Sequence, residues 1–358
     1  MRVRPLVLFS LVTVLILTGC APTPEVSPSP SASSPTPSPT PTPTEEPIEA
    51  PEAAFDVTCA DVNDVIAGLL GGSVGGEKDV MGLTSAPNWY PGPAQHMMQR
   101  AGGIACSAGD PEKFDPESSP DAYWGIAIVP DAQRILDGAA ERGAGENGAT
   151  GVRCYPSSCI IDLRDGEVLM SGSLRAPGIT EADEGRVHEA LEGILVSAAN
   201  TLREVEVGPS EIAAARCESL LTAEEVAAEL GTHVEITDFT MLGGWGIPAE
   251  VYYVKDGGQL CLYAEGLNIY EDATLVSLTT LPAGAWAFEE LDGASPEIVA
   301  GADAALSSVD FYGRSALDVR VGPDWLRFTF YDGRAAADMI PIATMAVEHL
   351  TRGRPSPQ

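Results

Sequence analysis

Basic residues and histidines are scarce in this sequence, and their scarcity excludes several functions. The chain has 20 lysines and arginines against 52 aspartates and glutamates, for a formal net charge of −32 over 358 residues. Nucleic acid and anionic lipid headgroups repel so acidic a protein. Such a surface favours solubility and permits only weak association with divalent cations or basic surfaces. We therefore expect an acidic, solvated surface and no nucleic-acid partner.

Long apolar runs are scarce as well, and the clearest one lies at the N-terminus. Arg2 and Arg4 flank the start of an apolar run from Pro5 to Leu17. That run is shorter than the ~20 residues that a membrane-spanning helix needs. A basic start followed by a short apolar core is typical of a signal peptide, which we predict for residues 1–19.

The signal segment ends in Leu17-Thr18-Gly19-Cys20, which resembles the lipobox of bacterial lipoproteins. In that family the cysteine is coupled to diacylglycerol and becomes the mature N-terminus. The resemblance implies lipid attachment at Cys20, and hence an anchor on the outer face of the cell membrane. The alternative is an ordinary secretory signal that happens to contain a cysteine. Of the seven cysteines, six remain after Cys20 is assigned to the lipid, an even set that can pair fully in an oxidising compartment.

Proline, serine and threonine dominate the stretch that follows. Ten of residues 21–50 are proline, so this stretch cannot bury apolar surface. We predict that residues 20–52 comprise the lipid-anchored cysteine and a disordered, extended stalk.

Two copies of one weak pattern follow the stalk, over residues 53–205 and 206–352, and residues 353–358 form a disordered tail. Each copy reads as a helix, strands, a short helix, a β-hairpin and a closing helix. The first hairpin turns at Asp165-Gly166, a strong turn signal, and Pro341 should kink or restart the second closing helix. Because strands and hairpins dominate, we predict an α+β fold of two tandem related domains. Each would be a mainly antiparallel sheet with helices packed on one face.

Both copies open on a cysteine and an amphipathic helix. Apolar residues recur at helical spacing after Cys59. After Cys217, Thr222 and Glu225 form a capping box, and Gly231 ends the helix. A second cysteine occupies an equivalent place later in each copy, so the repeat itself favours one pairing. The predicted disulfides are Cys59–Cys106, Cys217–Cys261 and Cys154–Cys159. A zinc site is the weaker alternative, because no histidine or further cysteine lies at ligand spacing.

No catalytic or metal-binding group stands out. The histidines share no motif, and we interpret them as solvated: His96, His188, His233 and His349. Residues 143–148 fit Gly-x-Gly-x-x-Gly but follow a helix and precede a strand, which favours a flexible loop over a dinucleotide site. The acidic loop 110–121 could hold calcium, but its spacing is not that of an EF-hand, which favours a solvated loop. We expect no enzymatic activity, no cofactor and no metal.

Two loops rich in glycine or proline carry aromatic residues at the same place in the two copies. Trp89 and Tyr90 lie in the first loop, and Trp245 lies in the second. These residues could contact a ligand or a partner protein. Alternatively, each tryptophan plugs the open side of its own sheet.

The chain resembles a large set of actinobacterial cell-envelope lipoproteins of unknown function. Their features are a lipobox, a Pro/Ser/Thr stalk, and domains in which a cysteine opens a helix that ends in Leu-Gly, with a second cysteine further on. Leu230-Gly231 and Leu70-Gly71 are the matching helix ends. The resemblance implies an exported, non-enzymatic module. We expect a binding or scaffolding lipoprotein that reaches the membrane through the lipid on Cys20 and acts on an unknown envelope ligand or protein. The alternatives are an envelope hydrolase or its accessory, and an acidic-faced regulator or inhibitor of an envelope protein.

Overall fold

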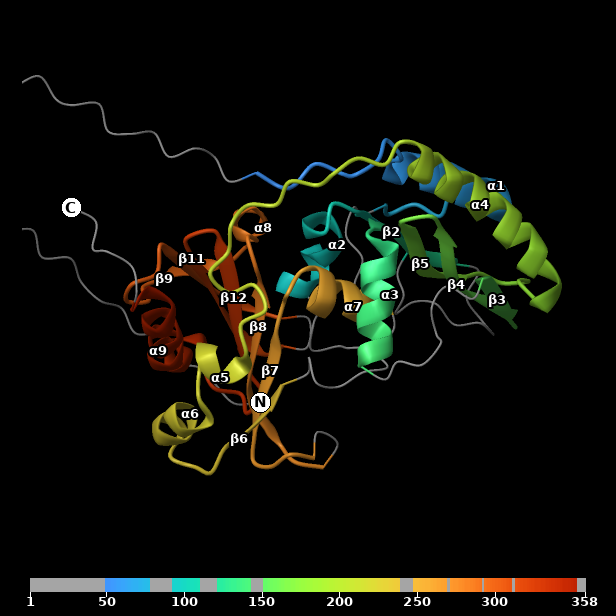
Figure 1. Ribbon diagram of the computed structural model, residues 1–358. Coiled ribbons are helices and arrows are strands. Elements are labelled where there is room, and N and C mark those ends of the chain that lie inside the picture. The colour runs from blue at the N-terminus through green and yellow to red at the C-terminus, as the bar shows by residue number, and fades with distance from the viewer. Residues whose placement is uncertain are drawn as a thin grey trace, which may run out of the picture. The chain divides into compact units, whose positions relative to one another are not determined.

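Two antiparallel sheets and the helices around them make up the computed structural model (Figure 1). They belong to one compact unit, Pro47–Gln358. The structure describes residues 49–77, 92–109, 121–142, 151–238, 247–268, 271–291, 293–310 and 313–352. Cys20, most of the predicted stalk and the tail 353–358 lie outside the described residues. The mixed α+β class and the antiparallel sheets are confirmed, whereas the boundaries at 53, 206 and 352 stay predictions.

The first sheet has five strands in the order β1-β2-β5-β4-β3, and each pair of neighbours is antiparallel. Its strands are β1 (Ile104–Ala108), β2 (Tyr123–Pro130), β3 (Gly151–Tyr155), β4 (Ser158–Asp165) and β5 (Val168–Arg175). The predicted hairpin turn joins β4 to β5, where Gly166 has a φ of 55°. A left-handed residue at this place is what a tight hairpin requires.

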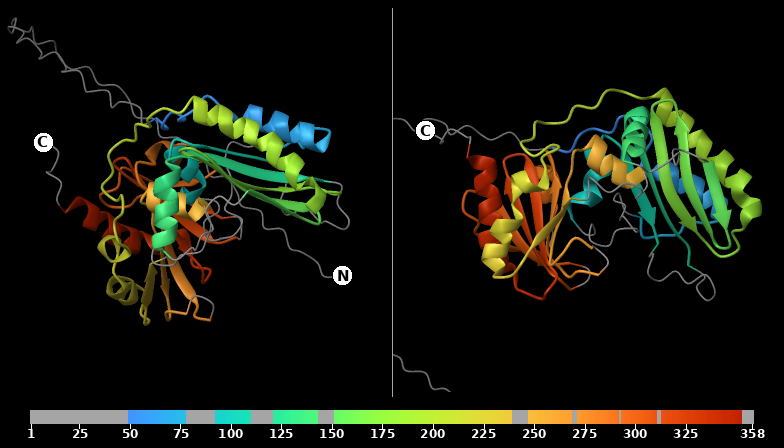
Figure 2. Two further views of the ribbon diagram at one scale, coloured as in Figure 1. Left: turned by 45° about the vertical axis from the view of Figure 1, so that its right-hand side comes forward. Right: turned by 60° about the horizontal axis from the view of Figure 1, so that its bottom comes forward.

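Helices α1 (Cys59–Leu70) and α4 (Glu184–Asn200) lie side by side on one face of this sheet (Figure 2). The Thr58 side chain accepts a hydrogen bond from the backbone N–H of Asp61 and caps α1. Gly71 ends the helix in the left-handed conformation, so α1 begins and ends where local signals place it. Between the two helices and the strands lies a core that includes Ile66, Trp124 and Leu191.

The second sheet has seven strands in the order β6-β7-β8-β12-β11-β10-β9. Its strands are β6 (Glu235–Asp238), β7 (Leu260–Ala264), β8 (Thr274–Leu281), β9 (Ser295–Glu297), β10 (Ala304–Val309), β11 (Ser315–Val321) and β12 (Asp324–Phe330). The inner five, β7-β8-β12-β11-β10, have the connectivity of β1-β2-β5-β4-β3. Strands β6 and β9 extend the edges.

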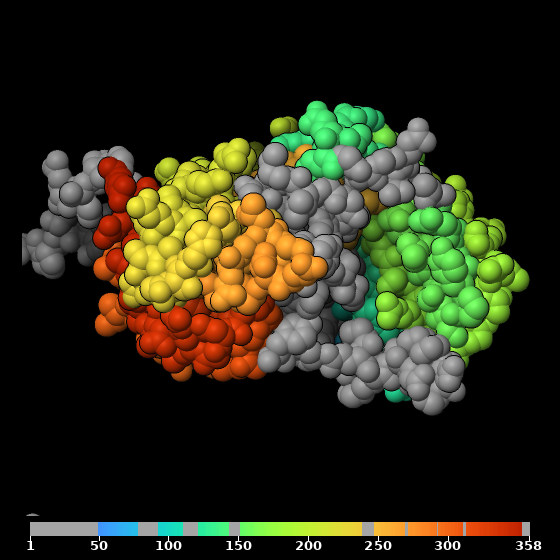
Figure 3. All heavy atoms as spheres, turned by 90° about the horizontal axis from the view of Figure 1, so that it is seen from below, coloured from blue at the N-terminus to red at the C-terminus, as the bar shows by residue number. Residues whose placement is uncertain are grey.

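One face of the second sheet packs against α5 (Cys217–Leu220), α6 (Ala223–Leu230) and α9 (Ile340–Thr351). In Figure 3 the yellow atoms of the first two helices lie beside the orange and red atoms of this half of the chain. Thr222 and Glu225 form the predicted capping box of α6, and Glu225 also bonds His349 of α9 at 2.8 Å. The last helix does restart at Pro341, because η6 (Ala336–Met339) gives way to α9 with proline in its first turn.

Several short helical segments lie apart from the helices that cover the two cores described above. They are η2 (Pro93–His96), α2 (Met97–Arg100), α3 (Ala132–Glu141), α7 (Ile247–Glu250), the π-helical η5 (Val251–Lys255) and α8 (Ala285–Phe288). All of them except α8 supply apolar residues to one further core, which joins the two halves of the chain and includes Ala94, Met97, Ile135 and Tyr252.

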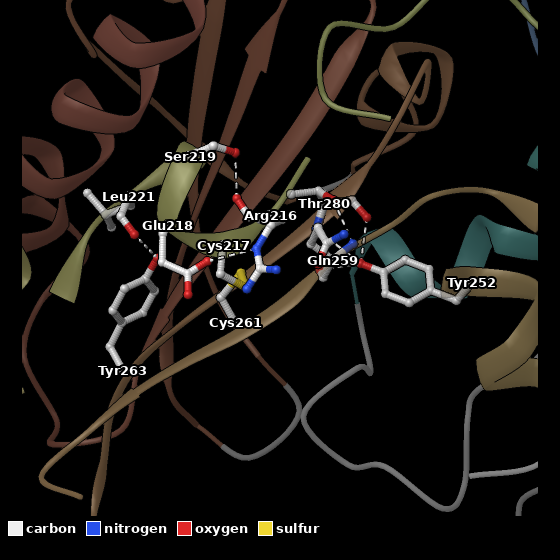
Figure 4. Close-up of a disulfide and its surroundings, with 10 residues drawn as sticks. All are labelled: Arg216, Cys217, Glu218, Ser219, Leu221, Tyr252, Gln259, Cys261, Tyr263 and Thr280. Atoms are coloured by element: carbon white, nitrogen blue, oxygen red, sulfur yellow. Dashed lines mark hydrogen bonds and ion pairs between the residues drawn. A yellow bond between two sulfur atoms is a disulfide. The ribbon is translucent and has the colours of Figure 1, made fainter. Parts of the chain in front are cut away.

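Three disulfides are present: Cys59–Cys106, Cys154–Cys159 and Cys217–Cys261. The equivalent positions of the two copies predict the first and the third of these pairs, and Cys154–Cys159 is the predicted pair of the two cysteines that remain. Around Cys217–Cys261 the hydroxyl of Tyr263 donates to the Leu221 carbonyl at 2.8 Å, so a hydrogen bond and a disulfide both tie the first turn of this half to β7 (Figure 4). Three disulfides indicate an oxidising, extracytoplasmic environment.

Candidate functional site

The predicted contact residues Trp89, Tyr90 and Trp245 lie outside the described residues, but the chain immediately after each loop is described. The segment after the first loop begins at Gly92, and the segment after the second begins at Ile247. Both segments contact the opposite half of the chain. We call these contacts, between residues 92–142 and residues 247–327, the junction.

The segment after the first loop lies on the second sheet. Helix η2 packs against β8 and β12, on the face that carries Trp325 and Arg327. This face is opposite to the helix-covered one, because neighbouring strand residues point to opposite sides. Gly92 meets the Arg327 side chain so closely that a Cβ there would lie 3.0 Å from Nη1. The position therefore fits glycine best, and the end of the loop is fixed against a charged group.

Arg327 forms a buried, two-pronged ion pair with Asp318 on the neighbouring strand. Its Nε donates to Oδ1 and its Nη2 to Oδ2, both at 2.7 Å, and the Trp325 indole N–H also donates to Oδ1 at 2.7 Å. Arg327 is 5% exposed and Asp318 is fully buried. Parallel bonds from a guanidinium to both carboxylate oxygens fix the orientation of both groups. The pair is a rigid platform for the segment above it.

His96 lies over this platform, between two indole rings. Its ring centroid is 5.5 Å from that of Trp286, edge-on, and 5.7 Å from that of Trp325. The interpretation of His96 as solvated is wrong, since only 9% of the residue is exposed. Burial, reinforced by the positive charge of Arg327, lowers the pKa of His96 from 6.5 to about 4. At neutral pH the imidazole is thus uncharged. Sequence reasoning missed this residue because its aromatic neighbours come from the other half of the chain.

The segment after the second loop makes the reciprocal contacts with the first half. Arg142 at the end of α3 donates to Glu250 Oε1 at 2.8 Å, and its guanidinium lies 4.7 Å from the centroid of the Tyr253 ring. Glu250 is 1% exposed. Lys255 pairs with Asp131 at the other end of α3. Two ion pairs of opposite polarity therefore hold α3 along the α7–η5 segment.

A third ion pair lies deeper in the junction. Arg100 approaches Asp256 at 3.5 Å and donates from Nε to the Pro282 carbonyl at 2.9 Å. The Asp256 side chain is fully buried, and burial raises its pKa well above the ordinary value in spite of Arg100, Lys255 and Arg134 nearby. Burial therefore outweighs the three cations and disfavours the charged form of Asp256.

A cavity of about 410 Å³ opens near the place where the stalk is expected to join the folded part. Acidic residues from two segments line it, namely Glu49, Glu52, Glu204 and Glu206. The chain just after Glu204 and Glu206 is held by the fully buried Asp324. This carboxylate accepts hydrogen bonds from the backbone N–H groups of residues 211 and 283. The cavity is part of the acidic surface that the composition predicts.

One short serine motif matches a pattern found in hydrolases. Residues 71–75 read Gly-Gly-Ser-Val-Gly and fit the Gly-x-Ser-x-Gly pattern of serine hydrolases. In those enzymes the serine stands between a strand and a helix. Here the motif follows α1, and the exposed Ser73 donates to Glu77 at 3.0 Å rather than to a histidine. The local structure is that of a helix end.

The remaining sequence candidates give no site. The glycine-rich residues 143–148 and the acidic loop up to residue 120 lie outside the described residues. Within the described ranges, no group of three histidine, cysteine, aspartate or glutamate side chains is arranged to hold a metal ion. No helix in the same ranges is both long and apolar enough to cross a membrane.

Comparisons with protein-family models, with curated proteins and with solved structures give no match to this chain.

Proposed function

We propose that this protein is an exported lipoprotein, held on the outer face of the cell membrane by a lipid on Cys20. Its role would be to bind or scaffold a ligand or protein of the envelope rather than to catalyse a reaction. The lipobox-like Leu-Thr-Gly-Cys, the proline-rich stretch after it and three disulfides all support export and anchoring. The shared strand connectivity supports two related copies of one domain in the folded part.

The observation that supports the binding role is that the described chain directly after each aromatic loop is held at the junction. Gly92, the first described residue after the first loop, packs on Arg327, and Ile247, the first after the second loop, lies three residues before Glu250, which bonds Arg142. A loop whose end is held by buried contacts to the opposite half has less conformational freedom to lose on binding. We therefore assign ligand or partner contact to the loops that carry Trp89, Tyr90 and Trp245.

Site-specific photocrosslinking on intact cells tests this assignment. A photoreactive residue would replace Trp89 or Trp245, and the control would carry it at Ile298, which is 88% exposed on the edge of the second sheet. We expect both tryptophan positions to give the same adduct and the control position to lack it. An adduct of equal yield at Ile298, or none at either tryptophan, contradicts the assignment.

Mass spectrometry of the protein from its native membrane tests the anchor separately. We expect the mature chain to begin at residue 20 with the mass of a diacylglyceryl group on the thiol. A Cys20→Ala variant should leave the membrane fraction. An unmodified N-terminal peptide that spans residue 20 would show that the anchor is wrong and would leave the binding role open.

A further inference from the structure

The two sheets place an aspartate at the same position of the same hairpin. In β4–β5, Asp162 lies three residues before Asp165, which pairs with Val168. In β11–β12, Asp318 lies three residues before Val321, the residue that pairs with the first residue of β12. Both aspartates point away from the helix-covered core, because the alternate residues of their strands fill it.

The residues opposite the two carboxylates differ. Asp318 faces Arg327, whose guanidinium bonds both carboxylate oxygens. Asp162 faces Ser171, whose hydroxyl donates to Oδ1 at 2.9 Å. Its Oδ2 accepts no hydrogen bond from the residues that the structure describes. The second sheet thus carries its own cation at this position, and the first sheet does not.

The described residues around Asp162 supply no cation that bonds its second oxygen. The residue is half-buried, and the strand beside it on the outer side contributes Gly151 at the paired position, which has no side chain. Of the nearby cations, Arg153 lies diagonally across on β3 and forms no ion pair of 4 Å or less with Asp162. Arg164 bonds the Gly166 carbonyl and a glutamine side chain instead. Burial raises the pKa of Asp162, whereas the bond from Ser171 and the charge of Arg153 lower it.

Exposed apolar surface adjoins this carboxylate. Ile160, the next residue on the same face of β4, is 42% exposed and pairs with Arg153, and Tyr155, which is 45% exposed, lies two residues beyond Arg153 on β3. An arginine side chain joins a planar, two-pronged cation to an apolar stem, so its two parts match the free carboxylate and the apolar surface.

We propose that Asp162 binds the guanidinium group of an arginine side chain presented by a protein partner. In the bound state this guanidinium would take the place that Arg327 occupies against Asp318. The proposal extends the binding role to residues other than those of the tryptophan loops, and either can fail without the other.

NMR of the carboxyl carbons in the full-length protein, labelled on aspartate, tests the proposal with blocked arginine as the probe. The Asp162 signal would be assigned by its loss in D162N. We expect saturating N-acetylarginine amide to lower the pKa of Asp162 by about 1 pH unit or more, as an adjacent opposite charge does. The corresponding citrulline derivative, which has the same shape without the charge, should leave it unchanged. No response to arginine, or an equal response to citrulline, overturns the proposal.

Two variants at Ser171 sharpen the result. S171R should recreate the pair of the second sheet, lowering the pKa of Asp162 without any probe and removing the response to blocked arginine. Because Ser171 is 8% exposed, the larger side chain could disturb the sheet. S171A serves in that case, since it removes only the bond to Oδ1 and should keep the response. Loss of the response in a folded S171A protein would mean that the serine, not the free carboxylate oxygen, provides the site.

Discussion

Acidification should destabilise the protein through His96. Folding lowers the pKa of this imidazole from 6.5 to about 4, because the ring is buried between Trp286 and Trp325 with Arg327 nearby. Below pH 6.5 the unfolded chain takes up a proton that the folded chain refuses. The stability that the neutral ring provides is therefore present at pH 7 and is lost as the pH falls towards the folded value. At 1.36 kcal/mol per pH unit, the loss between pH 7 and pH 5 is about 2 kcal/mol.

Urea denaturation of the disulfide-intact protein at pH 7 and pH 5 measures this loss. The test variant is H96F, which keeps an aromatic ring against the indoles but cannot ionise, and H96Q is the substitute if the larger ring is not accommodated. The control is H233Q, since the His233 side chain is 72% exposed. We expect the wild type and H233Q to lose about 2 kcal/mol more than H96F over this interval. An identical pH dependence in H96F and the wild type would refute the assignment of the effect to a buried neutral imidazole.

Asp256 and the disulfides give further predictions for stability. Burial raises the pKa of Asp256, so the folded state disfavours the carboxylate, and its contribution to stability falls as the pH rises above the ordinary value of 3.8. D256N should therefore gain stability relative to the wild type between pH 4 and pH 7. A difference in unfolding free energy that stays constant over this interval, measured from denaturation curves, would contradict this. Removing the Cys217–Cys261 disulfide by a double alanine substitution should cost about 4 kcal/mol, because the bond closes a separation of 44 residues. The same double substitution at Cys154–Cys159, with a separation of 5 residues, should cost about 2 kcal/mol. Equal losses of unfolding free energy in the two variants would argue against loop closure as the source of the stabilisation.

Local signals were enough for most of the regular elements. The capping box of Thr222 with Glu225 and the stop at Gly231 depend on residues within one helix, and the sequence alone places α6. The hairpin at Gly166 and the restart at Pro341 are equally local. Strands β6 and β9 were not anticipated, because they are short edge strands of four and three residues whose pairing depends on a neighbour already in place.

The disulfides were accessible from sequence for a different reason. Six cysteines in two similar copies favour a pairing that links equivalent positions within each copy, and Cys59–Cys106 and Cys217–Cys261 are that pairing. A lipobox resemblance and cysteine parity need no knowledge of the third dimension, so the sequence by itself determined the expectation of export, the α+β class and the covalent links.

The junction, by contrast, was decided only by the tertiary structure. Arg100 bonds the carbonyl of Pro282, 182 residues away, and His96 owes its low pKa to side chains about as distant in the chain. The burial and the electrostatic environment of a residue depend on the segments that pack against it, and the spacing of residues in the sequence does not specify them. For the same reason two aspartates at equivalent hairpin positions differ in the fold: Asp318 is paired with its strand neighbour Arg327, whereas no described residue bonds the second oxygen of Asp162.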